Sequence, residues 1–456
     1  MYLKTIFEVL RAHNLDYCIQ NSYENMPEKF PTDVDIFYRN ATEKDLDKIV
    51  SEAAQKADLL VIQKLAMGYK QYVYWLSPSL PKPEFQLELD FQQELSRKSM
   101  PHYYIPNKLL DHKIAYNGFF IPSPVDEIIY TVLRRTVKHN FNQYHLDTIV
   151  RDYNSDPQAI EQWLYRELPK TVANCILSII RNNSIDEFEK HYEVFIKYVK
   201  AESKKNNTIV KRLSQWKYYI CRMLPLRFLH PAGMDIALLA PDGGGKSTIL
   251  EALKKYKVTS FVGVERKYIR PGMFKNLGQY KPNAQPEMTD NPDPHGRKPD
   301  DAFKSWIRFL IYLLDFTLGY LVKIVPLKWQ RKLIIFDRYY YDYYVDMYRY
   351  HYSLPQWTPK LFDFMIPRPS LTFILHAPAE VLHSRKKELT LKETQRQCNT
   401  FKMLSTTLPN AMLIDVNRPI NVIVEDIVAE IVKKRAKLTQ KKLHIPHFPP
   451  LCITHG

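Results

Sequence analysis

Residues 234–256 combine three segments whose order allows few folds. Residues 234–240, MDIALLA, form a short apolar run that is typical of a strand buried on both faces of a parallel sheet. Three consecutive glycines follow at 243–245, in a chain that has only 12 glycines among 456 residues. Residues 246–256, KSTILEALKKY, have the composition and spacing of a helix. The order of strand, glycine loop and helix predicts an α/β unit built on a parallel sheet.

The glycine loop has the residues that a phosphate-binding loop needs. Glycines allow backbone N–H groups to turn toward phosphate oxygens, and the N-terminus of the following helix adds a positive dipole. Lys246 is expected to neutralise the β- and γ-phosphates, and Ser247 to hold Mg²⁺. The pattern GxxxxGK[ST] is met except at its first position, where Ala240 must avoid the positive φ values that glycine tolerates. The residues predicted to bind ATP are Asp242, Gly243, Gly244, Gly245, Lys246, Ser247 and Thr248.

Four segments follow one another in a recognisable order: PDGGGKST at 241–248, YIRPG at 268–272, LIIFDRY at 333–339 and SRKK at 384–387. They resemble the phosphate-binding loop, the arginine-proline-glycine motif, the DRY motif and the basic lid of thymidylate kinases. The resemblance covers about residues 230–436 and implies an ATP- and Mg²⁺-dependent kinase. It implies that Arg270, Arg338 and Asp242 meet the phosphate acceptor. The lid that it implies over the phosphates consists of Arg385, Lys386, Lys387 and Arg396.

The segment around Asp337 also has a physical interpretation of its own. The apolar run at 333–336 is a strand that delivers Asp337 to the carboxyl edge of the sheet, where α/β folds bind ligands. A carboxylate at this edge can orient an acceptor or hold a water of Mg²⁺, and Arg338 can clamp a phosphate. A strand-end salt bridge is the ordinary alternative for this pair, and a solvated helix is the alternative for the lid. The predicted catalytic residues are Lys246, Asp337, Arg338 and Arg385, with Ser247 and Asp337 at Mg²⁺.

Two departures from thymidylate kinases bear on the acceptor. Arg270 is joined directly to Pro271, without the glutamate that usually lies between them, and a tyrosine-rich run follows the DRY motif. The segments YIRPG, FDRYYYDYYVD and LPQW resemble instead a bacterial group of thymidylate-kinase-like proteins associated with surface polysaccharide synthesis. The acceptor is therefore dTMP or a related nucleotide, a sugar phosphate, or the end of a glycan. Two alternatives, stacking on a sugar or base and packing within an aromatic helix, stay open for Tyr339, Tyr340, Tyr341, Tyr343, Tyr344, Tyr348 and Tyr350.

The rest of the C-terminal half extends the same fold. Apolar runs at 371–377 and 411–416 alternate with helical segments as far as 421–435, which predicts a doubly wound parallel sheet with helices on both faces. Residues 309–322, FLIYLLDFTLGYLV, are strongly apolar but contain Asp315 and are only 14 residues long. Because a membrane span needs about 20 apolar residues, we predict a buried core helix there.

The N-terminal half contains a second candidate site. Asp33 and Asp35 lie two residues apart in the run TDVDIF, so a strand would place both carboxylates on one face, and Asp90 follows another alternating run. Such a set could bind two divalent metals for nucleotidyl transfer. The arrangement resembles the nucleotidyltransferase superfamily, which implies an α+β domain with a helix such as 125–139 behind its sheet. The family's glycine turn is replaced by Asn21 and Ser22, so an active enzyme, an inactive ligand-binding relic and plain structure stay open.

The predicted domains follow from these segments. They are a nucleotidyltransferase-like domain at 1–150, a helical extension at 151–200, a basic linker at 201–230, the kinase-like domain at 231–436 and a basic, proline-containing, disordered tail at 437–456.

Charge and cysteine usage bear on location and partners. The net charge is +16, and residues 201–227 carry seven Lys or Arg against one acid. This stretch is either a solvated linker or a contact with an anionic membrane or polyanion, and we expect no specific nucleic acid. Five widely spaced cysteines and an N-terminus without a cleavable signal favour the cytoplasm, with peripheral contact at the inner face of the membrane as an option. Besides a kinase, the open alternatives are a nucleotidyltransferase and a nucleotide-responsive regulator of a glycan assembly complex.

Overall fold

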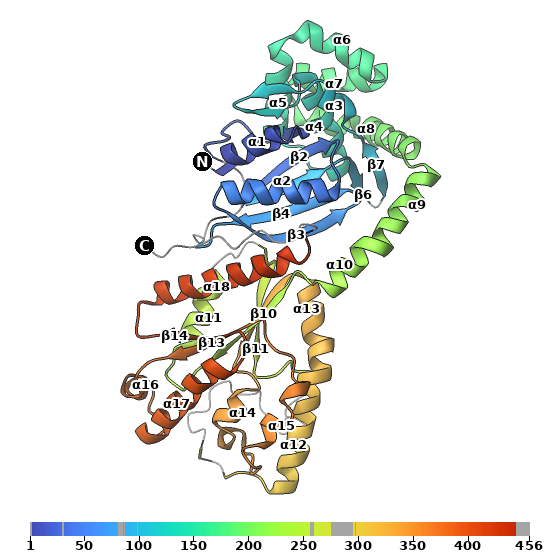
Figure 1. The fold of residues 1–456 in the computed structure, drawn as a ribbon. Coiled ribbons are helices and arrows are strands. Elements are labelled where there is room, and N and C mark those ends of the chain that lie inside the picture. The colour runs from blue at the N-terminus through green and yellow to red at the C-terminus, as the bar shows by residue number, and fades with distance from the viewer. Residues whose placement is uncertain are drawn as a thin grey trace. The chain divides into compact units, whose positions relative to one another are not determined.

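The computed structural model of the chain describes residues 2–29, 32–80, 85, 87–97, 99–255, 260–274, 295–296 and 298–443. It contains two compact units (Figure 1). Unit 1 comprises Met1–Leu76, Gln86–Pro225 and Thr439–Gly456, and unit 2 comprises Ser77–Phe85 and Leu226–Leu438. The residues predicted as a separate helical extension therefore belong to the same unit as the N-terminal sheet.

Unit 1 is built on a mixed five-stranded sheet in the order β1-β2-β5-β4-β3. The strands β2 and β5 are parallel, whereas β1 pairs with β2 and β4 pairs with β5 in antiparallel fashion. The first helix ends at Ala12, and the first strand begins at Asp16. The bounds are α1 Tyr2–Ala12, β1 Asp16–Gln20, β2 Asp33–Arg39, α2 Glu43–Lys56, β3 Leu60–Gly68, β4 Gln71–Ser77 and β5 Leu87–Gln92. Two small hairpins and a short helix follow, namely β6 Leu95–Arg97, β7 Met100–Tyr104, α3 Asn107–Asp111, β8 Ile114–Tyr116 and β9 Phe119–Ile121.

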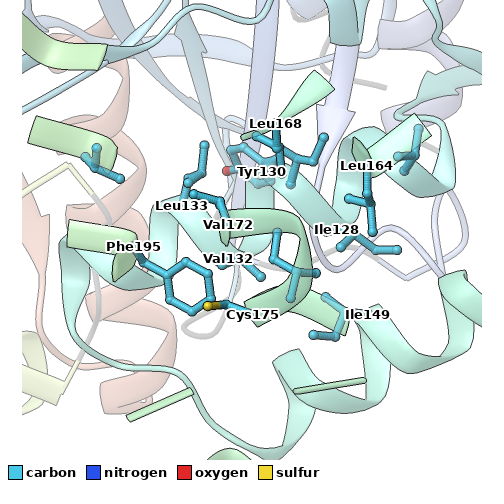
Figure 2. Close-up of a cluster of buried hydrophobic side chains, with 14 of the residues drawn as sticks. Ile128, Tyr130, Val132, Leu133, Ile149, Leu164, Leu168, Val172, Cys175 and Phe195 are labelled. Atoms are coloured by element: carbon cyan, nitrogen blue, oxygen red, sulfur yellow. The ribbon is translucent and has the colours of Figure 1, made fainter. Parts of the chain in front are cut away.

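Five helices complete the core of unit 1, as the sequence predicts for residues 125–139 and 151–200. They are α4 Pro124–Lys138, α5 Gln143–Ser155, α6 Pro157–Glu167, α7 Lys170–Asn182 and α8 Ile185–Asn206. Capping defines the start of α4: the Ser123 side chain accepts from the Asp126 N–H, and a proline occupies the first turn. Apolar side chains from α4, α7 and α8, among them Ile128, Val172 and Phe195, meet in one buried cluster (Figure 2).

Residues 207–229, predicted as a linker, are mostly helical. They form α9 Ile209–Tyr218, a π-helical turn η1 Tyr219–Met223, and α10 Leu224–Leu229, which follow one another as one helix (Figure 1). The side chain of Thr208 caps the first of them by accepting from the Lys211 N–H. None of the residues in these three segments is buried.

Unit 2 contains a five-stranded parallel sheet, which confirms the α/β prediction. Its order is β11-β12-β10-β13-β14, so the strand that precedes the glycine loop lies in the centre and later strands are added on both sides. All six residues of this central strand are buried, which explains why it is apolar except for Asp235, whose carboxylate pairs with Lys328 at 2.9 Å. The strand bounds are β10 Met234–Leu239, β11 Gly263–Tyr268, β12 Lys332–Asp337, β13 Leu371–His376 and β14 Ala411–Asp415.

The longer helices of unit 2 connect these strands. They are α11 Lys246–Lys255, α12 Ala302–Leu314, the π-helical segment η3 Asp315–Ile324, α13 Val325–Trp329, α16 Ala379–Arg385, α17 Leu391–Thr407 and α18 Ile420–Gln440. Shorter turns are α14 Asp342–Val345, η4 Tyr348–Tyr350, α15 Thr358–Leu361 and η5 Asp363–Met365. Because α18 continues to Gln440, the first residues of the predicted tail are helical, and residues 444–456 lie outside the described part of the chain.

The apolar segment 309–322 is only half buried, which corrects the prediction of a core helix. Phe309 and Phe316 are buried on one side, whereas Leu310 and Leu318 on the other side are exposed. The continuous helix Ala302–Trp329 is long and apolar enough to cross a membrane by length and composition, and 33% of its most apolar window is buried.

Candidate active site

A cavity of about 530 Å³ lies at the carboxyl edge of the unit 2 sheet. The glycine loop after β10 forms one wall, and Asp337 and Arg338 at the end of β12 form another. Strands β10 and β12 are parallel neighbours, with Leu238 opposite Asp337, so their carboxyl ends meet at the same edge. Seven Lys or Arg residues are among the described lining residues: Lys246, Arg266, Arg338, Arg349, Arg385, Lys386 and Arg418. The site is therefore built for an anion.

The backbone of the loop explains its glycines. Gly243 has φ +77°, and a Cβ there would lie 2.5 Å from the carbonyl oxygen of Leu382. Gly245 has φ +76°, which side chains rarely allow. Ala240, which replaces the first glycine of the motif, is buried and does not have a positive φ. The loop thus keeps two glycines at positive φ despite the substitution at its first position.

Lys246 begins α11 and lies inside the cavity. Its Nζ donates to the carbonyl oxygens of Ala240 at 3.1 Å and Pro241 at 3.4 Å. Burial, together with the positive charge of Arg338, lowers the pKa of Lys246 to about 8. An anion placed beside this ammonium would favour its charged form and raise its pKa again.

Asp242 and Arg338 form the centre of a buried charge network. Burial opposes ionisation of Asp242, yet Arg338 and Arg349 outweigh it and hold the pKa of this carboxyl at about 2. Arg338 donates to Asp242 at 2.7 Å and to Asp342 at 2.7 Å, and Arg349 donates to the other oxygen of Asp242. Arg338 also has φ +71°, an unusual value for a non-glycine residue, while its N–H donates to Leu238 at 3.0 Å. The turn after β12 therefore places the guanidinium of Arg338 beside Asp242, next to the glycine loop.

One carboxylate oxygen of Asp337 accepts a hydrogen bond, and the other, which we call the open oxygen, has no partner among the described residues. The side chain is 5% exposed, and one carboxylate oxygen accepts from Arg266. The other oxygen, Oδ1, is buried and has no hydrogen-bond partner within the described residues. A buried, unpartnered carboxylate oxygen at a cavity suits an acceptor hydroxyl or a metal-bound water. Ser247 lines the same cavity and supplies a second hard oxygen, so the residues present fit Mg²⁺.

Some predicted residues do not line the cavity. Arg270 instead donates to the buried carboxylate of Asp315 and lies 3.7 Å from the centre of the Tyr312 ring. Arg396 pairs with Glu393 and donates to a backbone carbonyl. Lys387 is exposed. The structure brings the other predicted kinase residues together at the cavity, namely Asp242, Gly243, Gly244, Gly245, Lys246, Ser247, Thr248, Asp337, Arg338, Arg385 and Lys386.

Sequence reasoning missed nine of the lining residues, and those with a charge or a hydroxyl are Arg266, Tyr268, Arg349, Glu388 and Arg418. Arg266 and Tyr268 are two residues apart in β11, so they share a face of the strand. This alternation, followed by the YIRPG segment, was the available signal. Arg349 and Arg418 lie in segments without a pattern of this kind.

Most of the tyrosine-rich run belongs to the core. Tyr339, Tyr340, Tyr341 and Tyr343 are at most 2% exposed. Their rings pack edge-on against Phe316 or one another, and the hydroxyl of Tyr340 donates to the Pro359 carbonyl at 2.8 Å. Of the two predicted alternatives, packing is therefore correct for these four, and a role in stacking on a ligand is wrong for them.

The three acids of unit 1 are arranged less favourably. Asp35 and Asp90 are directly opposite in the parallel pair β2 and β5, and Asp33 is exposed. Asp35 accepts from Arg134 at 2.9 Å, and Asp90 accepts from Gln71 at 2.9 and 3.1 Å. Burial, followed by the charge of Asp35, raises the pKa of Asp90 to about 7.

Asp33, Asp35 and Asp90 do not form a group whose three ligand atoms lie close enough together to hold one metal ion. Within the described part of the chain, one group of three has its ligand atoms within 4.8 Å of one another, and it consists of His295, Asp346 and Glu393 instead. Its carboxylates already accept from Gln397, and Glu393 also accepts from Arg396, so its contacts are those of a structural network.

Comparisons with known proteins do not place this chain in a family. No protein-family model matches the chain, and no curated protein matches it. Among solved structures, the thymidylate kinase of Candida albicans is similar at 18% identity and a TM-score of 0.31, over 44% of this chain and 93% of that one. A similarity at this level does not identify a family.

Proposed function

We propose that unit 2 is an ATP-dependent phosphotransferase. The observation that carries the proposal is the cavity in which a glycine cradle and Lys246 face Asp337 and Arg338 across the edge of a parallel sheet. One wall offers backbone N–H groups and a cation to phosphates, and the other offers a carboxylate and a guanidinium to an acceptor. Phosphoryl transfer depends mainly on positioning and on neutralising charge, and both are present.

Each group has a distinct role in the proposed reaction. The glycine loop and Lys246 hold the β- and γ-phosphates of ATP. Mg²⁺, when bound by Ser247 and Asp337, would further reduce the negative charge of the phosphates. Arg266 orients Asp337 by donating to one of its oxygens, while Arg385 and Lys386 approach the cavity from the segment at the end of α16 and neutralise the transferring group.

The transfer itself requires an acceptor oxygen in line with the γ-phosphate. That oxygen forms a bond to the γ-phosphorus as the bond to the β-γ bridging oxygen breaks, and ADP leaves. An acceptor phosphate needs no base because its oxygen is already deprotonated, so the open oxygen of Asp337 could then hold Mg²⁺. The proton of an acceptor hydroxyl would instead pass to this oxygen, and Ser247 would then be the residue that holds Mg²⁺.

The charges beside Asp337 favour a phosphate-bearing acceptor. Arg266, Arg338 and Arg349 all line the cavity, and guanidinium groups bind phosphate in a bidentate manner. The acceptor we propose is therefore dTMP or a related nucleotide, or a sugar phosphate, with a glycan end as the remaining candidate. A sugar phosphate or a glycan end would be an acceptor in surface polysaccharide synthesis. The tyrosine-rich segment supports these acceptors because it resembles a bacterial group of proteins associated with that synthesis.

Phosphate transfer from γ-labelled ATP tests the proposal directly. dTMP, other nucleoside monophosphates, sugar phosphates and isolated surface glycan are offered in parallel with Mg²⁺. We expect label on one of these acceptors, and Lys246→Ala should lower kcat by about a hundredfold or more. Lys254→Ala is the matched control, because this lysine lies on the same helix but pairs with Glu251 at 2.7 Å. Transfer that survives Lys246→Ala would contradict the proposal.

The second candidate function is nucleotidyl transfer by unit 1. It is favoured because Asp35 and Asp90 lie directly opposite each other in the neighbouring strands β2 and β5. Its test is release of pyrophosphate from a nucleoside triphosphate with Mg²⁺ or Mn²⁺. Loss of this activity in the double variant Asp33→Asn with Asp35→Asn, and its survival in Lys246→Ala, would place the main chemistry in unit 1. Turnover in neither assay would leave a nucleotide-responsive regulator of glycan assembly as the proposal to pursue.

A further inference from the structure

The helix formed by α9 and η1 is attached to unit 1 by one face only. Lys211 lies 3.6 Å from Glu94, and Arg222 pairs with Glu43 at 2.8 Å. Between them, the ring of Tyr218 lies edge-on to Tyr69 with centroids 5.7 Å apart. Residues 211, 218 and 222 are spaced by seven and four, so they project from the same side of the helix. This side faces the body of unit 1.

The opposite side is apolar and exposed. Ile209, Leu213, Trp216, Ile220 and Leu224 follow one another at intervals of four, three, four and four, which is the spacing of a single helical face. Each is between 46% and 74% exposed. We call these five residues the α9 stripe. An exposed continuous row of large apolar side chains marks a surface that binds something apolar.

Positive charge flanks the α9 stripe. Arg212 and Lys217 are exposed beside it, and Lys204 and Lys205 precede it at the exposed end of α8. The chain has no Asp or Glu from residue 203 to residue 234. A helix with an apolar face, basic residues at its margins and a tryptophan in the stripe has the features of helices that lie in the interface of an anionic bilayer. A protein partner would not require this one-sided charge.

We propose that the α9 stripe inserts into the headgroup region of an anionic membrane and holds the protein there as a peripheral protein. The apolar side chains enter the boundary between headgroups and acyl chains, while Arg212 and Lys217 contact lipid phosphates. This proposal does not depend on the kinase activity, because the contact belongs to unit 1 and uses none of the residues of the cavity.

Sedimentation with lipid vesicles tests the proposal on the full-length protein. The vesicles contain either phosphatidylcholine alone or phosphatidylcholine with about one third phosphatidylglycerol. We expect binding to the anionic vesicles that weakens as salt is raised, and weak binding to the neutral ones. The double variant Arg212→Glu with Lys217→Glu should lower the partition coefficient at least tenfold, at about fivefold per basic residue removed.

Substitution of apolar residues of the α9 stripe by serine distinguishes membrane insertion from simple attraction to a polyanion. Leu213→Ser with Ile220→Ser keeps every charge, and should still lower the partition coefficient by about tenfold or more because less apolar surface is buried. The fluorescence of the wild-type protein should shift to the blue on binding, and this shift should be smaller in Trp216→Phe. The matched charge control is Lys197→Glu with Lys200→Glu, two exposed residues of α8, which should leave binding nearly unchanged.

Several outcomes would overturn the proposal. One is the absence of binding to anionic vesicles, and another is binding that both double variants of α9 leave intact. Binding lost in Leu310→Asp but not in the α9 variants would move the membrane contact to the exposed face of α12. A dimer that Leu213→Ser with Ile220→Ser dissociates, without any vesicle binding, would make the stripe a protein interface. Because the stripe is not buried, circular dichroism should show that these variants fold.

Discussion

The pKa of Lys246 predicts how nucleotide affinity depends on pH. This pKa is about 8, lowered by burial and by the positive charge of Arg338. Bound phosphates reverse the effect, because a negative charge beside the ammonium favours its protonated form. The pKa is therefore higher in the complex than in the free protein. Affinity should be constant well below pH 8 and should fall as pH rises above it, since the neutral lysine must first take up a proton.

The size of the effect follows from the fraction of protein that is protonated. At about pH 9, about one tenth of the free protein carries the proton on Lys246, so the dissociation constant should be about tenfold larger than at about pH 7, or about 1.4 kcal/mol weaker in binding free energy. Isothermal titration with a non-hydrolysable ATP analogue measures this directly. The lowest pH used should stay above about 7, because the terminal phosphate of the ligand titrates near pH 6.

Two variants make the interpretation specific. Lys246→Arg keeps its charge throughout this range and should lose the pH dependence. Lys254→Ala, on the same helix, should retain it. Titrations in two buffers with different ionisation enthalpies should reveal uptake of nearly one proton per nucleotide at about pH 9. A dissociation constant that stays unchanged across this range, or an equal decline in Lys246→Ala, would refute the proposed contact between Lys246 and phosphate.

Three further predictions concern other residues. Asp337→Asn removes the charge of the carboxylate that would accept a proton, so kcat should fall by about a hundredfold or more with a hydroxyl acceptor and much less with a phosphate acceptor, while nucleotide affinity stays within about threefold, as steady-state kinetics and titration will show. Gly243→Ala forces a side chain into a positive φ and against the Leu382 carbonyl, so ATP should no longer raise the melting temperature, whereas Gly68→Ala should respond to ATP like the wild type. The pKa of Asp90 is raised from 3.8 to about 7, so unit 1 should lose up to about 4 kcal/mol of stability as pH rises from about 4 to about 7. Asp90→Asn should remove this loss in denaturant titrations, and an unchanged pH profile would contradict the assigned burial.

The parts of the site that are local in sequence could be predicted, and those that depend on distant contacts could not. The run before the glycine loop is apolar except for Asp235, and residues 333–336 before Asp337 are all apolar; such segments become central strands of parallel sheets. Arg266 meets Asp337 across 71 residues of sequence, and Arg349 meets Asp242 across 107. Arg349 has nothing in its neighbourhood that distinguishes it from an arginine at the surface, and the one local signal for Arg266 is its position two residues before Tyr268 in β11.

Two half-exposed helices, in residues 201–230 and 309–322, contain sequence patterns that favour different structures. In residues 201–230 the density of positive charge predicted a linker, although the apolar spacing of Leu213, Trp216 and Ile220 is that of a helical face. In residues 309–322 total hydrophobicity predicted full burial. The structure buries only the face that carries Phe309 and Phe316, because the opposite face has no neighbour among the described residues that covers it.

Asp242 supplies a counterion inside the basic cavity. Its carboxylate satisfies Arg338 and Arg349 in the free protein, so the cavity carries an internal counterion that an incoming phosphate must compete with. A weakly charged metabolite gains too little from these arginines to displace it, whereas a ligand with several negative charges can exchange partners with both. The same carboxylate that lowers the affinity for any single phosphate thereby favours highly charged ligands over small anions.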